Sequence, residues 1–383
     1  MSGGLRGRAA IVGVGQAGLG EMPGYSALEI LGLAVREALA DCGLRLGDVD
    51  GLFTGSSYHF MPTLSVAEYL GIRPRFSDGS MVGGSSFVAH LLHAALALDA
   101  GLCDVALIAY GSNQRSAGGR LVSMSEPQPH ERLYEPRHPI TAYALAASRH
   151  MHQFGTARED LAAVAVAARD WARLNPEAFL RGPLSVEEVL AARMVSDPLT
   201  VRDCCLVTDG GGAVVMVRAE RARDFSRAPA YFLGGASTLS HRAIAEMADL
   251  TVSGAKDSGE RAYAMAGLGP GDVDVVELYD AFTINTVLFL EDLGFCPKGE
   301  GGRFVREGHI APGGSLPVNT NGGGLSCVHP GMYGIFITIE AVRQLRGEAG
   351  ERQVRDAEIA LVHGNGGTLS SQVTTLLGTG ATI

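Results

Sequence analysis

Short apolar segments alternate along the chain with longer segments in which apolar residues recur every three or four positions. The clearest helix is expected at Ser26–Cys42, where the apolar residues fall on one face and Ser26 can cap the first turn. Further helices are expected at Ser86–Ala100 and Leu161–Asn175, and strands at Ala9–Val14, Val49–Phe53, Val105–Tyr110 and Gly212–Val217. Strands that alternate with helices in this way predict an α/β fold.

Three stretches of the first half recur in the same order in the second half. The matched stretches begin at Gly43 and Gly267, at Val82 and Gly322, and at Asp104 and Ala357. Any two strand–helix–strand units look somewhat alike, but a shared order of three matches favours an internal duplication. We therefore expect two related halves, residues 1–228 and 229–383. The segment 112–196 has no counterpart and is expected to be an insertion that carries substrate contacts.

Composition and charge narrow the class of protein. The 383 residues are 46% hydrophobic and 19% charged, which is typical of a compact globular protein. A net charge of −10 without a Lys/Arg-rich run argues against nucleic acid as a partner, although a few local arginines can still bind an anion. No apolar run reaches the roughly 18 residues that span a bilayer, and the six cysteines lack CxxC or metal-ligand spacing. We expect a cytoplasmic protein with free thiols, no metal and no membrane span.

Two glycine-rich turns offer backbone donors and hydroxyl groups. The turn at residues 81–87 leads into a helix, whose free N–H groups can stabilise an oxyanion near Gly84. Ser85 and Ser86 in this turn are candidates for substrate contact, or they simply cap the helix. The turn at residues 277–282 ends a strand with Tyr279 and Asp280. Tyr279 can donate a hydrogen bond or transfer a proton, and Asp280 can orient it or cap a helix; a purely structural tyrosine is the alternative.

Two further turns present histidines. His329 precedes a proline, which favours extended backbone, and a histidine so held suits proton transfer near neutral pH. His363 comes at the end of a buried strand and is followed by a glycine turn in which Asn365 and Gly366 can direct donors at an oxygen. His329 could instead be a packed core residue. Together, the four turns predict an acid–base site surrounded by backbone donors.

The motifs resemble the thiolase superfamily, most closely the sterol-carrier-protein-X-type thiolases and their bacterial lipid-transfer-like relatives. The run Cys204–Ala213 resembles the stretch that closes the first thiolase half, and Leu293–Phe304 resembles the bacterial relatives. The resemblance covers essentially the whole chain. It implies a duplicated five-layer αβαβα core with an inserted loop domain, a homodimer formed through the sheet of the first half, and an acyl-CoA substrate without a covalently bound cofactor.

The resemblance also assigns positions to the family's catalytic residues. The nucleophilic cysteine of the family falls at Gly84, give or take one residue, where this chain has no cysteine. Tyr279 takes the oxyanion-hole position, His329 matches the retained histidine, and His363 replaces the second catalytic cysteine. The resemblance therefore implies a branch that lacks the nucleophile. The remaining cysteines are not interpreted as nucleophiles, in particular Cys204, Cys205 and Cys296.

Without a thiolate to accept the acyl group, ordinary thiolysis is not expected. The groups that remain suffice for a retro-aldol cleavage of a β-hydroxyacyl-CoA, as in relatives that shorten steroid or other branched side chains. In this hypothesis Tyr279 is the base, His329 stabilises the enolate and His363 transfers the second proton, with roles that can be exchanged. The backbone near Gly84, Ser85 and Asn365 supplies donors.

The sequence leaves open whether a partner subunit is required, which function the chain has, and which acyl group and arginines are involved. The resemblance implies a small partner subunit with an OB fold and a zinc ribbon. A first alternative function is acyl transfer or Claisen condensation with Ser85 or Ser86 as the nucleophile. A second is a non-catalytic lipid-binding or scaffold subunit. The acyl group and the arginines that bind CoA are not specified.

Overall fold

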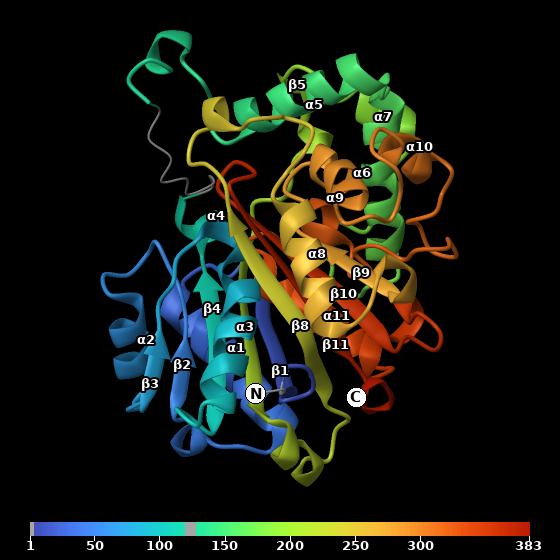
Figure 1. Cartoon of the computed structure of the whole chain (residues 1–383). Coiled ribbons are helices and arrows are strands. Elements are labelled where there is room, and N and C mark those ends of the chain that lie inside the picture. The colour runs from blue at the N-terminus through green and yellow to red at the C-terminus, as the bar shows by residue number, and fades with distance from the viewer. Residues whose placement is uncertain (1–3, 119–127) are drawn as a thin grey trace.

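Nine strands form one mixed sheet in the computed structural model, which describes residues 4–118 and 128–383 (Figure 1). The sheet runs in the order β3-β2-β4-β7-β1-β8-β11-β10-β9. Its strands are β1 (Ala9–Gly20), β2 (Gly51–Phe53), β3 (Phe76–Asp78), β4 (Val105–Ser112), β7 (Asp209–Arg218), β8 (Ala230–Leu239), β9 (Val275–Leu278), β10 (Ile359–Gly366) and β11 (Ser371–Gly378). A separate hairpin pairs β5 (Met194–Ser196) with β6 (Leu199–Thr200).

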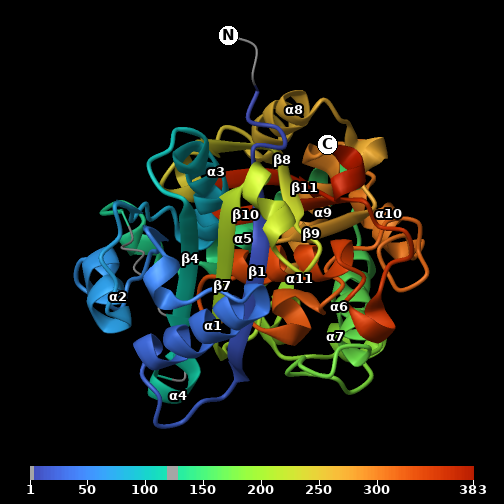
Figure 2. The ribbon, with the colours of Figure 1, turned by 90° about the horizontal axis from the view of Figure 1, so that it is seen from below.

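The two halves of the sheet repeat the same strand arrangement outward from the junction of β1 and β8. These two strands lie side by side in both views (Figures 1 and 2). Outward from β1 the neighbours are β7, β4, β2 and β3, and outward from β8 they are β11, β10 and β9, with a parallel bridge from Val276 to Val318 in the fifth place. The directions match as well: antiparallel, antiparallel, then parallel. This topology supports the proposed division at 228/229, just before β8.

Helices lie on both faces of each half-sheet and between the halves. The central helices α3 (Ser86–Asp99) and α11 (Gly334–Leu345) contact each other and strands of both halves. On the outside, α1 (Ala27–Cys42) packs on β1, β4 and β7, and α8 (Ala255–Ala266) packs on β8 and β11. Helices thus alternate with the two halves of the continuous sheet in the order helix, half-sheet, helix, half-sheet, helix, which is the layering that the resemblance implied.

Local signals explain where the repeated elements begin and end. The Ser26 hydroxyl accepts a hydrogen bond from the Glu29 backbone N–H (3.3 Å) and caps α1 as predicted. Gly43 ends α1 and Gly267 ends α8, both with φ in the left-handed region, and a short turn leads from each into a parallel strand. The first of the three sequence matches therefore marks equivalent places in the two halves.

Two strands are longer than the sequence suggested, because most of their glycines are paired within the sheet. β1 continues to Gly20 and β7 begins at Asp209, and Gly15 pairs with Ala213. A Cβ on Gly15 would lie 2.3 Å from the Ala38 backbone nitrogen in α1. Glycine here lets the helix approach the sheet closely; it does not end the strand.

The insertion lies between β4 and β7 and packs against the second half. Its long helices are α5 (Ile140–Phe154) and α6 (Arg158–Arg173), with the short α4 (Gln114–Gly118) and α7 (Val186–Leu190). The Trp171 indole N–H donates to the Ile310 carbonyl (2.9 Å), and α6 contacts α9 (Thr283–Asp292) and α10 (Gly301–Arg306). In the first half, α2 (Pro62–Leu70) flanks β2. Part of the predicted 112–196 segment, residues 119–127, lies outside the described residues.

The described residues contain no helix long and apolar enough to cross a membrane. In the same part of the chain, no group of His, Cys, Asp and Glu side chains is arranged to hold a metal ion, and all six cysteines are unpaired thiols.

Candidate active site

A cavity of about 330 Å³ lies where the predicted glycine-rich turns meet. Tyr279 and His329, which the sequence singled out, both line it, and so do Gly84 and Asn365. Most of the remaining wall is aromatic or apolar, with Tyr58, Met81, Tyr110, Tyr143, Phe282 and Met332. The turns thus converge on one pocket, as the hypothesis of a single site requires.

Tyr279 is held rigidly at the floor of the cavity. It follows β9, and its backbone N–H donates to the His363 carbonyl on the neighbouring strand (2.9 Å). Its hydroxyl donates to the Gly331 carbonyl and accepts from the Tyr333 backbone N–H, both at 3.2 Å. Burial raises the pKa of Tyr279 well above its ordinary value of 10, so the phenol keeps its proton at neutral pH.

The Tyr279 ring fills the space beside Gly84. A Cβ on Gly84 would lie 2.3 Å from two ring carbons of Tyr279 and 2.4 Å from its hydroxyl oxygen. A side chain at position 84 and the tyrosine at 279 therefore exclude each other in this packing. The position to which the resemblance assigned the family's nucleophilic cysteine is occupied here by a phenol.

His329 directs an unpaired imidazole at the cavity. Its backbone is fixed because its N–H donates to the Thr208 hydroxyl (3.0 Å) and its carbonyl accepts from the Gln114 amide (3.0 Å). The residue is 4% exposed, yet neither ring nitrogen has a hydrogen-bond partner within the described residues. Burial lowers the pKa of His329 to about 4, so the ring is neutral at pH 7 with one nitrogen as donor and one as acceptor. The Tyr279 and His329 rings meet edge-on, with centroids 5.4 Å apart.

Asp280 does not reach the cavity, which corrects its assignment as a substrate-binding residue. Its carboxylate is buried and accepts hydrogen bonds from the backbone N–H groups of Gly324 (2.6 Å) and Leu325 (3.3 Å). Burial raises the pKa of Asp280 to about 7 despite these donors. A Cβ on Gly323 would lie 2.0 Å from the Asp280 carboxylate. Asp280 therefore shapes the turn that precedes His329.

His363 also lies outside the cavity, contrary to its predicted contact with substrate. Its ring is fully buried against Phe289, with Nδ1 2.9 Å from the Thr374 hydroxyl and Nε2 2.9 Å from the Gln372 side-chain oxygen. Burial lowers the pKa of His363 to about 4. Residues 363 and 365 share one face of β10, and Asn365 occupies the row nearer the cavity. The sequence match placed His363 on the correct strand but one row too deep.

A line of hydrogen bonds still connects His363 to the cavity. The Gln372 amide donates to the Asn365 side-chain oxygen (2.7 Å), and the Asn365 amide donates to the Tyr143 hydroxyl (2.8 Å). Tyr143 lies in α5 of the insertion, and its hydroxyl also donates to the Gly367 carbonyl (3.0 Å). His363 can therefore position Asn365 and Tyr143 without touching a ligand.

Ser85 and Ser86 are occupied by local hydrogen bonds and do not line the cavity. The Ser85 hydroxyl lies 2.8 Å from both the Val82 carbonyl and the Ser371 hydroxyl. The Ser86 hydroxyl donates to the Gly83 carbonyl (2.7 Å) and accepts from the Val82 N–H (2.9 Å). Both side chains are buried without a base beside them, which disfavours either as a nucleophile.

Gly366 is likewise displaced from the cavity, whereas its neighbour Gly367 lines it. A Cβ on Gly366 would lie 1.8 Å from the Val82 carbonyl oxygen. This close packing brings the turn after β10 against the turn before α3. Gly366 is therefore needed for the approach of two backbones, not for substrate contact.

Several lining residues had no signal in the sequence. Tyr58 and Arg242 lie in segments without a recognisable motif, and Tyr143 was covered only by the general expectation that the insertion supplies contacts. Cys205 also lines the cavity, but burial raises the pKa of its thiol well above 9. A thiol that stays protonated is a poor nucleophile, in agreement with the exclusion of Cys205 from catalysis.

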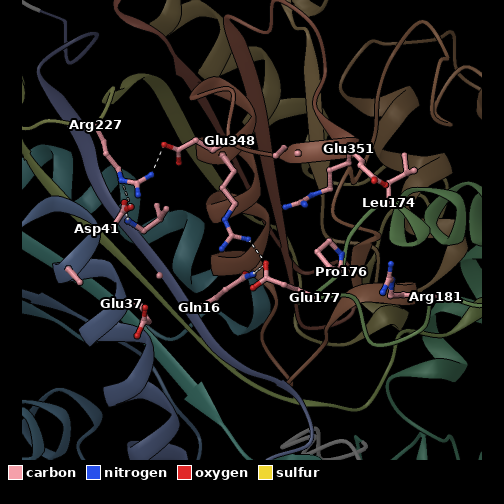
Figure 3. Close-up of a pocket in the computed structure, with 17 residues that line it drawn as sticks. Gln16, Glu37, Asp41, Leu174, Pro176, Glu177, Arg181, Arg227, Glu348 and Glu351 are labelled. Atoms are coloured by element: carbon pink, nitrogen blue, oxygen red, sulfur yellow. Dashed lines mark hydrogen bonds and ion pairs between the residues drawn. The ribbon is translucent and has the colours of Figure 1, made fainter.

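A larger cavity of about 930 Å³ lies away from these residues (Figure 3). Most of its charged side chains are paired with one another: Arg343 with Glu177 (2.8 Å), and Arg227 with Asp41 (2.9 Å) and Glu348 (2.6 Å). It contains none of the sequence-predicted site residues. We therefore assign the chemistry to the smaller cavity, which His329 lines with two buried ring nitrogens that have no partner within the described residues.

Comparison with known proteins identifies the family. Residues 236–379 match the family described as "Thiolase C-terminal domain-like". The "Acetyl-CoA acetyltransferase" of Methanothermobacter thermautotrophicus is 34% identical over 376 residues, which cover 94% of this chain and 96% of that protein. The "17-hydroxy-3-oxo-4-pregnene-20-carboxyl-CoA lyase" of Mycobacterium tuberculosis is 37% identical over 364 residues, which cover 90% and 92%. The chain belongs to the thiolase superfamily.

Comparison with a solved structure shows that the similarity of this thiolase-superfamily chain extends to its three-dimensional fold. The "Ltp2-ChsH2(DUF35) aldolase" superposes with a TM-score of 0.88 at 32% identity and covers 98% of both chains. The predicted superfamily and the thiolase-like α/β fold are thereby confirmed. The loss of the nucleophilic cysteine at Gly84 stays a prediction, supported by the Tyr279 ring in its place.

Proposed function

We propose that this thiolase-superfamily chain is an acyl-CoA lyase that cleaves β-hydroxyacyl-CoA thioesters by a retro-aldol reaction without an acyl-enzyme. The observation that carries the proposal is the contact of Gly84 with Tyr279, because a phenol replaces the side chain that would accept an acyl group. Beside it, the neutral and unpaired His329 supplies a proton acceptor and a donor in a largely apolar pocket. The lyase and aldolase names of two similar proteins point the same way.

The reaction needs one proton to move and one carbon–carbon bond to break. A base removes the proton of the β-hydroxyl, the bond between the α- and β-carbons breaks, and its electron pair passes into the thioester as an enolate. The β-carbon leaves as a ketone or aldehyde. The same proton, returned to the α-carbon, gives the shortened acyl-CoA, so the enzyme ends unchanged. Donors placed at the enolate oxygen lower the barrier, typically by about 3 kcal/mol for each donor.

The charge states of His329 and Tyr279 favour a different catalytic role for each side chain. Because His329 is neutral at pH 7, it can accept the hydroxyl proton. Because Tyr279 keeps its proton, it can donate a hydrogen bond to the enolate once its hydroxyl turns away from the Gly331 carbonyl, to which it donates in this structure. This exchanges the roles that we assigned from the sequence. N–H groups near Gly84, at the start of α3, are further donors. His363 and Asp280 act as positioning residues through Asn365 and the turn before His329.

The cavity wall suggests a bulky acyl group. Tyr58, Tyr110, Tyr143 and Phe282 provide flat apolar surface, which suits a ring system better than a linear chain. The relative from Mycobacterium tuberculosis is named for a 17-hydroxy steroid substrate. We propose a substrate whose β-hydroxyl is tertiary and attached to a ring, as in the degradation of steroid side chains. CoA enters as part of the substrate, and no covalently bound cofactor takes part.

Two assemblies are part of the proposal. We propose that this chain works in the cytoplasm with a small OB-fold and zinc-ribbon partner; the partner is supported by the similar structure named "Ltp2-ChsH2(DUF35) aldolase". A homodimer would form through β3, the edge strand of the first-half sheet, beside the exposed Phe60 and Leu64. Both are tested by the mass of the purified protein with and without the candidate partner.

Acyl transfer remains the second candidate, because one similar protein is named an acetyltransferase. Incubation with a ring-bearing tertiary β-hydroxyacyl-CoA, with the partner added, separates the two reactions. A lyase releases a ketone and a shortened acyl-CoA, and His329→Ala abolishes both products while the protein stays folded. An acyltransferase of the thiolase type instead leaves this β-hydroxyacyl-CoA uncleaved, and splits a β-ketoacyl-CoA with free CoA into two acyl-CoA products. If neither product forms with any thioester tested, the enzyme proposal is wrong and a scaffold role is favoured.

A further inference from the structure

Arg242 is an uncompensated positive charge at the rim of the active-site cavity. It lies in the exposed loop after β8, and it is the one arginine or lysine among the described residues that line this cavity. None of the lining residues is acidic, and within the described residues the Arg242 guanidinium forms no ion pair. In the larger cavity, by contrast, Arg227 and Arg343 are neutralised by carboxylates.

Thr368 places a second unsatisfied polar group in the same wall. The residue is 7% exposed, and its hydroxyl has no hydrogen-bond partner within the described residues. A buried hydroxyl without a partner is destabilising, and a ligand oxygen would supply the missing partner. An arginine and a hydroxyl that both lack partners therefore line one cavity.

The two loops that carry these residues are joined to each other. The His241 Nε2 lies 2.9 Å from the Thr368 carbonyl oxygen, and the Ser240 N–H donates to the Ser370 carbonyl (3.0 Å). The Ser370 hydroxyl in turn donates to the Arg242 carbonyl (3.4 Å). Figure 1 shows the loop after β8 and the turn between β10 and β11 at the same end of the sheet. Arg242 and Thr368 are thus held beside each other before any ligand binds.

We propose that Arg242 and Thr368 form an anion subsite at the cavity rim that binds an oxygen anion of the substrate. This inference deepens the proposed function, on which it rests, because it selects among acyl-CoA thioesters. A guanidinium with a neighbouring hydroxyl matches phosphate and carboxylate oxygens alike. The anion is either a phosphate of CoA or a carboxylate carried by the acyl group. A local cation is needed in either case, because the chain as a whole carries a net charge of −10.

Equilibrium binding to the intact chain tests the subsite without requiring turnover. The probes are CoA against pantetheine, which lacks the phosphates, and glutaryl-CoA against pentanoyl-CoA, which differ by one carboxylate at equal chain length. The variants are Arg242→Gln and Thr368→Val, which removes the hydroxyl at nearly constant volume. Arg36→Gln, an exposed arginine on α1 outside the cavity, is the matched control.

A phosphate ligand predicts that Arg242→Gln weakens CoA binding about tenfold but leaves pantetheine unchanged, with a smaller loss for Thr368→Val. A carboxylate ligand predicts the same loss for glutaryl-CoA relative to pentanoyl-CoA, with CoA unaffected. Either pattern supports the subsite and identifies the source of the anion. Affinities within twofold of the wild type for all four probes, a loss shared by pantetheine, or no binding of any anionic probe by the wild type would each contradict it.

The anion subsite and the lyase reaction can be contradicted independently of each other. If no cleavage products are found but Arg242→Gln still weakens an anionic probe selectively, the subsite stands and the proposed reaction falls. If cleavage is found but the affinities of all probes are unchanged, the reaction stands and the subsite falls.

Discussion

The ring of Tyr279 occupies the space into which a side chain at Gly84 would project, since a Cβ on Gly84 would lie 2.3 Å from the ring. If the family's nucleophile falls at Gly84, as the resemblance implies, that nucleophile and this tyrosine cannot be present together in the same packing. Two changes that are far apart in sequence are one change in space. The predicted loss of covalent catalysis and the phenol in the pocket are thus linked by geometry.

Adding a single carbon to Gly84 is expected to destabilise the protein. Gly84→Ala should lower the free energy of unfolding by about 1–3 kcal/mol, because the new methyl group overlaps the buried ring. Combining it with Tyr279→Ala, which vacates the space, should cost less than the sum of the single changes. Urea unfolding measures all three. Gly47→Ala is the control, since nothing lies within 4 Å of a Cβ there; additive effects at Gly84 and Tyr279 would contradict the steric link.

The pH dependence of turnover distinguishes the two assignments of the base. If neutral His329 accepts the proton, kcat/KM should be flat from about pH 6 to 9 and fall only as the pH approaches the lowered His329 pKa of about 4. If Tyr279 is the base, its raised pKa predicts a rate that rises with pH across this range. The profile of Tyr279→Phe identifies the source of any rise. A rise that persists in this variant would implicate neither residue.

The buried histidine also affects stability. Because the folded-state pKa of His329 is lowered from 6.5 to about 4, only the unfolded chain gains its proton between these values. The contribution of His329 to the free energy of unfolding is therefore largest above pH 6.5, and it decreases as the pH falls towards 4. His363, with its pKa also lowered to about 4, acts in the same direction. Between pH 6.5 and 4.5, the free energy of unfolding should change less steeply with pH in His329→Ala than in the wild type. The difference in slope should correspond to the uptake of about one proton on unfolding. Equal slopes in urea titrations would show that His329 is not buried as a neutral ring.

The hydrogen-bonded line from His363 predicts an indirect effect on activity. Gln372→Leu removes the link between His363 and Asn365 without altering a residue that lines the cavity. We expect kcat to fall about tenfold or less, compared with roughly 100-fold or more for His329→Ala. The double variant Gln372→Leu with His363→Leu should be little worse than the weaker single variant, because both break one line. Independent, multiplying losses would assign His363 a role of its own.

Much of the fold could be predicted, because its signals are local. Ser26 and Gly43 delimit α1 through capping and a left-handed turn, and the repeated turn at Gly267 ends α8 in the same way. The lengths of β1 and β7 could not be predicted, because Gly15 resembles a turn residue in sequence. Only the close approach of α1 gives that glycine its reason.

The site was predicted only in part, for a related reason. Tyr279 and His329 were singled out because each lies in a recognisable turn, and both line the cavity. His363 lies on β10 but one row away from the cavity, since a sequence match does not show which row of a sheet meets a cavity. Tyr143 and Arg242 reach the pocket from distant segments through folding alone.

The central claim is a retro-aldol cleavage without an acyl-enzyme. It is tested most directly by cleavage in heavy water, with the masses of the protein and of the product measured in the same sample. We would incubate the chain and its partner in D₂O with a ring-bearing tertiary β-hydroxyacyl-CoA, then measure the intact protein mass and the mass of the released thioester. A non-covalent retro-aldol reaction predicts an unmodified protein, a ketone, and a shortened acyl-CoA with one deuterium on its α-carbon. An acyl adduct on the protein, or a shortened thioester without deuterium, would contradict the account.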